Sequence, residues 1–244
     1  LAVYGDMDIS KLIEKPTHRK SIITLSKPEE KIHEILLFIK KQINKGNQIF
    51  WICPLIEESK KLDYSAAKKK YSFLSSKFTN KVGLIHGSLS KDEREEVLKK
   101  FLKGNINILV STTIIEVGVD FPNANVIIIE DSNKFGLSQL HQLRGRVGRG
   151  TKQSTCILLF KKNLSENAKK RIKILKSSND GFFIAEEDMK LRGFGDVLGY
   201  QQSGIKDFKI ADPIHHEDLF KLAEKNIKEI NLKEDNFKKY NFLL

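Results

Sequence analysis

The chain is expected to adopt an α/β fold in which a parallel β-sheet carries helices on both faces and is followed by a helical hairpin and a loop extension. Short apolar runs alternate with segments of helical periodicity through the first two thirds of the sequence. Such alternation is typical of β-α-β units, whose parallel strands are buried on both faces. Beyond Lys161 the apolar runs stop, and helical segments with a glycine-studded loop take their place.

Six short apolar runs account for the strands. Each is four to six residues long and rich in aliphatic or aromatic residues, as expected of buried strands. In chain order, the expected strands are residues 21–25, 48–53, 82–86, 106–110, 126–129 and 155–160. A chain of 244 residues can bury such a core in one or two domains.

The segments between these runs have apolar residues at helical spacing. The first ends before Gly46, and its apolar stripe is formed by Ile32, Ile35, Leu36, Ile39 and Ile43. Residues 57–79 are helical and lysine-rich, and residues 139–147 form a helix before the last strand. Between these two, Ser90 and Glu93 make an N-terminal capping box for a further helix. The side chains that this helix is expected to bury are Val97, Leu98, Phe101 and Leu102.

Two helices and a long loop are expected after Lys161. One helix is marked by Ala168, Ile172 and Leu175, and residues 184–191 form the next. The loop is punctuated by glycines at positions 193, 195, 199 and 204. Long loops of this kind are more often functional than incidental. A terminal helix is marked by Leu219, Leu222, Ala223, Ile227 and Ile230.

These elements group into three parts. Residues 1–20 show no core pattern and are expected to be the end of a preceding domain and a linker. Residues 21–162 form the α/β domain, and residues 163–244 form the helical hairpin, the loop and the C-terminal helix. The boundaries fall where the hydrophobic pattern changes.

The chain is basic, with 43 Lys and Arg against 31 Asp and Glu and a net charge of +12. This charge suits a polyanion such as DNA, because each neutralised phosphate releases counterions. An equally good alternative is that many lysines reflect composition alone and lie on solvated surfaces. The two cysteines are far apart and no histidines or cysteines have metal-ligand spacing, so no bound metal is expected. No apolar run approaches the roughly 20 residues that span a membrane, and the reducing cytoplasm is the expected location.

The segment from Gln142 to Arg149 contains three arginines separated by glycines. Arg146 and Arg149 are three residues apart, so they would share a face of a helix or helical turn. Gly145 and Gly148 lack side chains and therefore let another surface approach. A guanidinium binds phosphate oxygens bidentately and keeps its charge. The pattern predicts arginine fingers, which stabilise charge on a transferred phosphoryl group; the alternative is a solvated basic loop.

The sequence lacks the motifs that would hold the phosphates of a nucleotide. It has no glycine-rich loop ending in Gly-Lys-Ser or Gly-Lys-Thr, and its only Asp-Glu step, Asp92-Glu93, starts a helix. Glu130-Asp131 follows an apolar run, but in the reversed order. ATP and Mg²⁺ are therefore expected to be held mainly by another domain.

Polar residues follow the strand at 106–110. Ser111-Thr112-Thr113 comes first and Glu116 to Asp120 next, and hydroxyls and amides at the carboxyl end of a strand are well placed to hold phosphates. Together with the arginine segment they resemble motifs V and VI of superfamily 2 helicases, in which a second RecA-like domain closes on ATP bound by the first. The implied roles are nucleic-acid backbone contact for Thr112 and Thr113, nucleotide contact for Gly118 and Asp120, and a link between the two for Gln142 and Arg144.

Other segments narrow the resemblance to the RecG family of branch-migrating DNA translocases. They are Trp51 to Ser59, His86-Gly87, Asp188 to Gly199, Gln202-Ser203-Gly204 and Phe208 to Asp212. Residues 165–212 are similar to the TRG (translocation in RecG) motif, which is shared with the transcription-repair coupling factor Mfd. The chain departs from the family at Phe194, Asp196 and Tyr200-Gln201, where Pro, Glu and Thr-Arg are usual.

The resemblance implies the second RecA-like motor domain of an ATP-dependent translocase that acts on branched duplex DNA, such as forks and Holliday junctions. It also implies DNA contacts for His86 and Gly87 and a coupling hub formed by Arg171, Arg192 and Gln202. An N-terminal wedge and a first motor domain of the same protein would be the partners. In the simpler alternative, Arg171 and Arg192 pair with surface carboxylates. The alternative functions are a non-catalytic DNA-binding fragment and the corresponding half of an Mfd-like translocase.

Overall fold

The computed structural model describes residues 20–54, 60–112, 121–192, 219 and 222, without the side chains of residues 60–64 and 192. Contacts divide the chain into two units, residues 16–197 and residues 1–15 together with 198–244. In the second unit only Leu219 and Leu222 are described, and both are helical and exposed. The rest of the expected terminal helix lies outside the described residues. All strands and helices with described bounds belong to the first unit.

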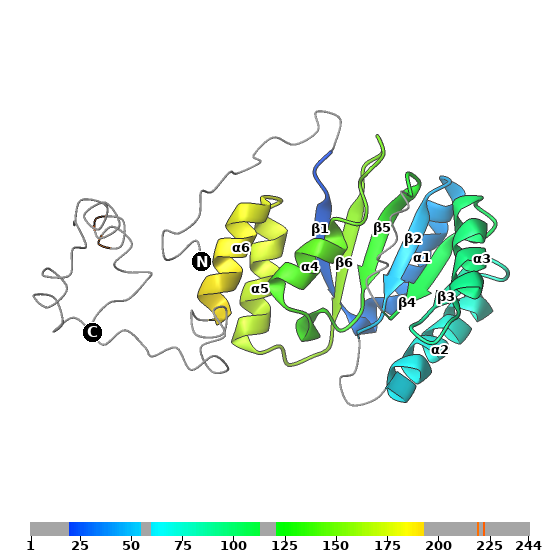
Figure 1. The fold of residues 1–244 in the computed structure, drawn as a ribbon, viewed down its shortest axis with the longest axis horizontal. Coiled ribbons are helices and arrows are strands. Elements are labelled where there is room, and N and C mark those ends of the chain that lie inside the picture. The colour runs from blue at the N-terminus through cyan, green and yellow to red at the C-terminus, as the bar shows by residue number, and fades with distance from the viewer. Residues whose placement is uncertain (1–19, 55–59, 113–120, 193–218, 220–221, 223–244) are drawn as a thin grey trace, which may run out of the picture. The chain divides into compact units, whose positions relative to one another are not determined.

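The first unit is built on a six-stranded sheet (Figure 1). Its strands are β1 (Ile23–Pro28), β2 (Gln48–Ile52), β3 (Val82–Ile85), β4 (Ile108–Ser111), β5 (Ala124–Ile129) and β6 (Thr155–Phe160). Their order across the sheet is β1-β6-β5-β2-β4-β3, and every neighbouring pair is parallel. The described helices are η2 (Glu29–Lys31), α1 (Ile32–Asn44), α2 (Lys60–Lys77), α3 (Lys91–Leu102), η3 (Ser132–Lys134), α4 (Leu137–Arg144), α5 (Glu166–Ser177) and α6 (Gly181–Arg192). The expected parallel sheet with connecting helices is confirmed.

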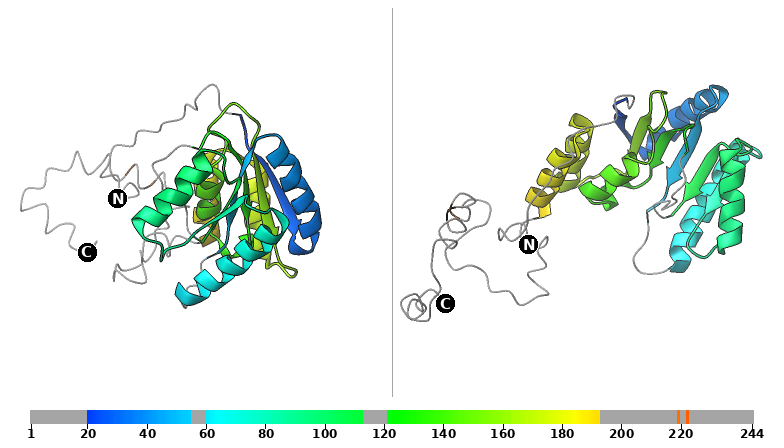
Figure 2. Two further views of the ribbon diagram at one scale, coloured as in Figure 1. Left: turned by 90° about the vertical axis from the view of Figure 1, so that its right-hand side faces the viewer. Right: turned by 45° about the horizontal axis from the view of Figure 1, so that its top comes forward.

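Helices cover both faces of the sheet (Figure 2). On one face α1 and α2 pack in a core that includes Trp51 and Ile128. On the other face α3, α4, α5 and α6 pack in a core that includes Phe50 and Ile127. Successive strand residues point to opposite faces, so Phe50 and Trp51 enter different cores. The strands are apolar on both sides for this reason.

Several expected bounds differ by two or three residues from those of the structure, and one expected core residue is wrong. Leu102 is 41% exposed rather than buried, because it ends α3 and lies about 100° around the helix from the buried Phe101. The first strand begins at Ile23 rather than at residue 21. Helix α4 ends at Arg144 rather than at residue 147. Gly148, just beyond the expected end, has a φ of +80°, which a right-handed helix does not contain.

The sequence signal for the start of α3 is confirmed. The Ser90 hydroxyl accepts a hydrogen bond of 3.3 Å from the Glu93 amide, and the Glu93 carboxylate accepts one of 2.9 Å from the Ser90 amide, so the expected capping box is confirmed. Helices α5 and α6 pack against α4, and α5 also packs against β1. The helical hairpin therefore extends the core of the sheet, while the domain boundary expected at residue 162 stays a prediction.

Candidate nucleotide and nucleic-acid sites

The parallel sheet has two distinct edges, one where all strands begin and one where they end. In Figure 1 the arrowheads mark the carboxyl edge. His86 and Gly87 follow β3 and Thr112 follows β4, so these predicted DNA-contacting residues lie at the carboxyl edge. The connection 145–154 leads from α4 into the start of β6, which places it at the amino edge. The fold therefore places the predicted DNA residues and the predicted arginine fingers at opposite edges.

The connection 145–154, here called the arginine loop, carries Arg146 and Arg149. Arg146 is half-buried and Arg149 is exposed, and between them Val147 is fully buried. Because α4 ends at Arg144, the two arginines do not share the face of a continuing helix as the sequence predicted. Their relative position depends instead on how the loop packs against the rest of the amino edge.

Two glycines hold the arginine loop against its own chain. Gly148 has a positive φ, and a Cβ there would lie 3.2 Å from a methylene carbon of Ile22. A Cβ on Gly150 would lie 2.7 Å from the carbonyl oxygen of Pro122, closer than real Cβ contacts allow. The sequence predicted that Gly148 would leave room for another surface. The structure shows that it is needed for the loop's backbone conformation and for contact with the residue before β1.

Arg144 has a structural role that the sequence did not reveal. Its guanidinium is buried and donates hydrogen bonds to the carbonyl oxygens of Leu175 at 2.6 Å and Ser178 at 2.9 Å. It also donates to the hydroxyl of Thr24 at 3.2 Å and to Nδ1 of His141 at 3.0 Å. Burial lowers the pKa of Arg144 from its ordinary value, but an arginine remains charged. The cation therefore lies at the C-terminal end of α5, where unpaired carbonyl groups carry partial negative charge.

Arg171 makes the reciprocal contact from α5 to the segment before α4. It donates hydrogen bonds to the carbonyl oxygens of Phe135 at 2.7 Å and Asn133 at 3.2 Å. These described partners are backbone carbonyls, which differs from the surface carboxylates of the simpler alternative. Ser138 of α4 and the buried Asp188 of α6 also share a hydrogen bond. Helix α4 is thus linked by side chains to both helices of the hairpin.

The structure describes only some of the remaining residues that were predicted for the nucleotide site and the hub. Gln142 is exposed on α4. Arg192 ends α6, and its side chain lies outside the described residues. The other members, Thr113, Gly118, Asp120 and Gln202, also lie outside the described residues. The predicted hub of Arg171, Arg192 and Gln202 therefore stays a prediction.

The carboxyl edge offers an uneven surface to a nucleic acid. Gly87 is exposed, with open space where a Cβ would be. His86 is half-buried, and its Nδ1 accepts a hydrogen bond of 3.3 Å from the Ser88 amide. Burial lowers the pKa of His86, with the charge of Glu93 opposing the shift. Thr112 is only 4% exposed, so its predicted contact with a nucleic-acid backbone requires a rearrangement of this edge.

Glu130, which the sequence analysis set aside because Glu130-Asp131 has the reversed order, organises this edge. Glu130, directly after β5, forms an ion pair of 2.5 Å with Lys70 of α2. It also accepts hydrogen bonds from the indole of Trp51 at 3.3 Å and from the thiol of Cys53 at 3.4 Å. Burial and the negative charge of Glu130 raise the pKa of Cys53 well above its usual range. The available signal was the position of Glu130 after a buried strand, where a carboxylate needs a partner.

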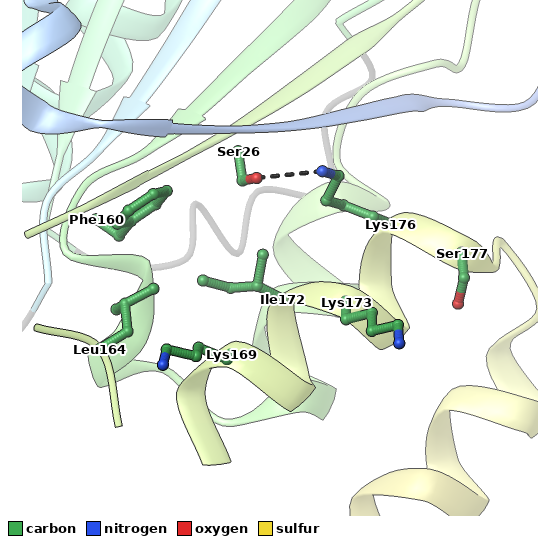
Figure 3. A pocket seen from close by; sticks show the side chains of 8 residues that line it. All are labelled: Ser26, Phe160, Leu164, Lys169, Ile172, Lys173, Lys176 and Ser177. Carbon is green, nitrogen blue, oxygen red and sulfur yellow. Dashed lines mark hydrogen bonds between the residues drawn. The ribbon is translucent and has the colours of Figure 1, made fainter. Parts of the chain in front are cut away.

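A separate cleft lies between β1, the end of β6 and α5 (Figure 3). Its volume is about 390 Å³, and it is lined by Ser26, Phe160, Leu164, Lys169, Ile172, Lys173, Lys176 and Ser177. The lysines belong to α5, and Lys176 donates a hydrogen bond of 3.3 Å to Ser26. None of the predicted nucleotide-site or DNA-site residues lines this cleft.

Two features are absent from the described part of the chain. No helix there is both long and apolar enough to cross a membrane. Nor does that part contain a group of three or more His, Cys, Asp or Glu side chains arranged to hold a metal ion.

Known proteins resemble the chain along nearly its whole length. Residues 27–151 match the helicase conserved C-terminal domain, and residues 178–243 match domain 3, C-terminal, of the ATP-dependent DNA helicase RecG. The ATP-dependent DNA helicase RecG of Bacillus subtilis is 48% identical over 228 residues, which are 93% of this chain and 33% of that protein. That of Thermotoga maritima is 43% identical over 232 residues, which are 94% of this chain and 30% of that protein. The chain spans about a third of the length of these relatives.

A solved structure is also similar. It is a structure of RecG bound to a three-way DNA junction, and it matches 85% of this chain and 26% of its own chain. The TM-score is 0.67 and the sequence identity is 40%. The similarity therefore extends from the sequence to the arrangement of strands and helices.

Proposed function

Because the chain belongs to the helicase conserved C-terminal domain family, in the form found in RecG, we propose that it is the second motor domain and coupling extension of an ATP-dependent double-stranded DNA translocase. The translocase would remodel stalled replication forks and branched recombination intermediates in the cytoplasm. The observation that carries this proposal is the placement of the arginine loop and the predicted DNA residues at opposite edges of one sheet. A domain with this arrangement can face a nucleotide with one edge and DNA with the other.

At the amino edge, Arg146 and Arg149 are proposed to meet the γ-phosphate of ATP when the two motor domains close. ATP, when bound, supplies the phosphoryl group whose transfer to water drives the cycle. The exposed position of Arg149 and the half-buried position of Arg146 fit a phosphate group arriving from outside this domain. Gln142, Gly118 and Asp120 are proposed to complete this side of the site. The phosphate cradle and the Mg²⁺ carboxylates would belong to the first motor domain.

At the carboxyl edge, DNA backbone is proposed to contact His86, Gly87, Thr112 and Thr113. The exposed backbone at Gly87 supports this role, because an approaching phosphate meets no side chain there. The buried Thr112 would become accessible only with a movement of this edge, which is what closure of two domains around DNA can supply.

Coupling between the two edges is proposed to pass through the hairpin, with Arg171, Arg192 and Gln202 as its hub. The hydrogen bonds from Arg144 to the end of α5 and from Arg171 to the segment before α4 support this role. They tie the helix that leads into the arginine loop to the hairpin that leads into the glycine-studded loop. A displacement of one is therefore transmitted to the other.

Complementation tests the proposal against the alternative of a non-catalytic DNA-binding fragment. The purified chain alone should hydrolyse no ATP, because the phosphate cradle is absent from its sequence. Mixing it with the N-terminal part of the same protein should restore DNA-stimulated ATP hydrolysis. Turnover by the chain alone would contradict the proposal, and the absence of any restored activity would favour the non-catalytic fragment.

A further inference from the structure

A chain of buried polar side chains lies beneath the arginine loop. Ser154, the last residue before β6, donates its hydroxyl to the amide oxygen of Asn125 at 3.2 Å. The amide nitrogen of Asn125 donates to Asn47 at 3.1 Å and to the carbonyl oxygen of Asn123 at 3.2 Å. Asn47 in turn donates to Gln42 of α1 at 2.7 Å. These bonds run along the amino edge from β6 across β5 to the start of β2.

The members of this chain are among the most deeply buried polar residues described. Asn125 is 1% exposed, Ser154 is 2% exposed and Asn47 is 7% exposed. Burying an amide or a hydroxyl costs free energy unless its hydrogen bonds are made, and apolar groups of the same shape could fill the space in β5 at little or no cost. The hydrogen bonds of the polar chain fix the relative positions of the groups that they join.

The hydrogen bond between Ser154 and Asn125 fixes the C-terminal end of the arginine loop. Further contacts hold the same end of the loop. Gln153 donates to the carbonyl oxygen of Ser21 at 2.6 Å, and Lys152 reaches Asn47 at 3.5 Å. A Cβ on Gly148 would lie 3.5 Å from the hydroxyl oxygen of Ser154, so the residue before Arg149 packs directly over the polar chain. Ser154 lies five residues after Arg149 and is anchored by its hydrogen bond to Asn125.

We propose that Asn125 and Ser154 are positioning residues for the arginine fingers. These two residues set the position and orientation of the arginine loop at the amino edge. The inference rests on the proposed function, since it assigns these residues to the site that Arg146 and Arg149 would form. Neither residue touches the nucleotide. They act through the loop, and a displacement of about 1 Å in a reacting group can lower a rate about 100-fold.

Gln48 provides a matched control on the same edge. It is 3% exposed, and its side-chain amide donates to the carbonyl oxygens of Phe101 and, at 3.4 Å, Ile106. These partners belong to α3 and the connection to β4, on the side of β2 away from the arginine loop. Gln48→Ala therefore removes a buried amide of similar size without loosening the loop.

The test measures steady-state ATP hydrolysis and Tm in the full-length protein with saturating DNA. Ser154→Ala and Asn125→Ala are expected to lower kcat about 10- to 100-fold with little change in the KM for ATP. Gln48→Ala should lower Tm as Asn125→Ala does but leave kcat nearly unchanged. Combined with Arg149→Ala, each of the two loop variants should add little further loss, because both changes act on one interaction.

Two results would overturn the inference. One is an unchanged kcat in Ser154→Ala and Asn125→Ala while Arg149→Ala still abolishes turnover. The other is a loss of kcat that follows the loss of Tm in all three buried-polar variants, which would make the polar chain a folding element only. If Arg149→Ala itself left kcat unchanged, the proposed finger role would fail instead, so the two failures are distinguishable.

Discussion

The guanidinium of Arg144 donates a hydrogen bond of 2.6 Å to the backbone carbonyl oxygen of Leu175. This bond joins the last residue of α4 to the last turn of α5. An arginine in a segment that resembles a nucleotide-binding motif is thus used to hold two helices together. The proposed finger role falls to the arginines further along the loop, and the hairpin is hydrogen-bonded to the helix that precedes them.

Arg144 should contribute strongly to stability. Arg144→Met removes the donor from two backbone carbonyl oxygens, those of Leu175 and Ser178, and the expected loss in the free energy of unfolding is about 3 kcal/mol. Urea denaturation of the chain measures it. Arg146→Met, two residues away and half-buried, is the control and should change stability by less than about 0.5 kcal/mol. Equal losses in the two variants would contradict the structural role of Arg144.

The fingers should act on the rate of hydrolysis. In the full-length protein, Arg149→Ala or Arg146→Ala should lower kcat about 10³- to 10⁵-fold and leave DNA affinity nearly unchanged. Lysine should restore little activity, because a point charge cannot reproduce the bidentate guanidinium. Arg94→Ala, at an exposed arginine of α3, is the control. An effect confined to KM would show that these arginines bind the ground state instead.

The hub should couple hydrolysis to DNA movement. Gln202→Ala or Arg192→Ala in the full-length protein should keep most DNA-stimulated ATP hydrolysis and abolish fork unwinding, because the fingers still close while the loop no longer moves DNA. Pairs of hub variants, including those at Arg171, should be little worse than single ones. Lys170→Ala, at an exposed neighbour on α5, should unwind forks normally. If hydrolysis and unwinding fell in equal proportion, the hub would be a folding or closure element.

The two cysteines should be unreactive toward thiol reagents in the native protein. Burial raises the pKa of Cys156 to about 12 and also raises the pKa of Cys53. Because the thiolate is the reactive form, both thiols stay protonated and unreactive across the neutral range. Labelling by N-ethylmaleimide at about pH 8 should be slow in the folded chain and fast in denaturant. Rapid labelling of either native cysteine would show that its edge of the sheet opens.

The fold was predictable to a large extent because its signals are local. Burial of strands on both faces produces apolar runs, and the capping box at Ser90 lies within four residues of sequence. Two of the errors lie where a helix ends. Leu102 is apolar but points away from the core, and after Arg144 the amides of Arg146 and Val147 donate to the carbonyl oxygens of Leu143 and Arg144, three residues back, instead of continuing α4.

The roles of the candidate site residues stay predictions, and the sequence did not show how those residues are arranged. Residue types and spacing alone led to Arg146 and Arg149, because phosphate recognition needs guanidinium groups and close approach. The opposite placement of the arginines and His86 follows from the parallel direction of the strands, but which strands are neighbours depends on a strand order that sequence periodicity does not encode. The polar chain of Asn125 and Ser154 was not recognised either, since isolated Asn and Ser residues are usually turn or surface residues.

Local chemistry in the sequence was enough to predict an α/β domain, arginine fingers and a basic surface, since each of these depends on residues close together in the chain. The α/β domain is confirmed, while the finger role stays a prediction. The assembled fold was needed to order the strands, to place Arg144 against α5 and to bury a polar chain beneath the arginine loop. Arg144 meets Thr24 across 120 residues of sequence, and Asn125 meets Asn47 across 78. Contacts at such separations arise from the packing of strands and helices, which no short segment specifies.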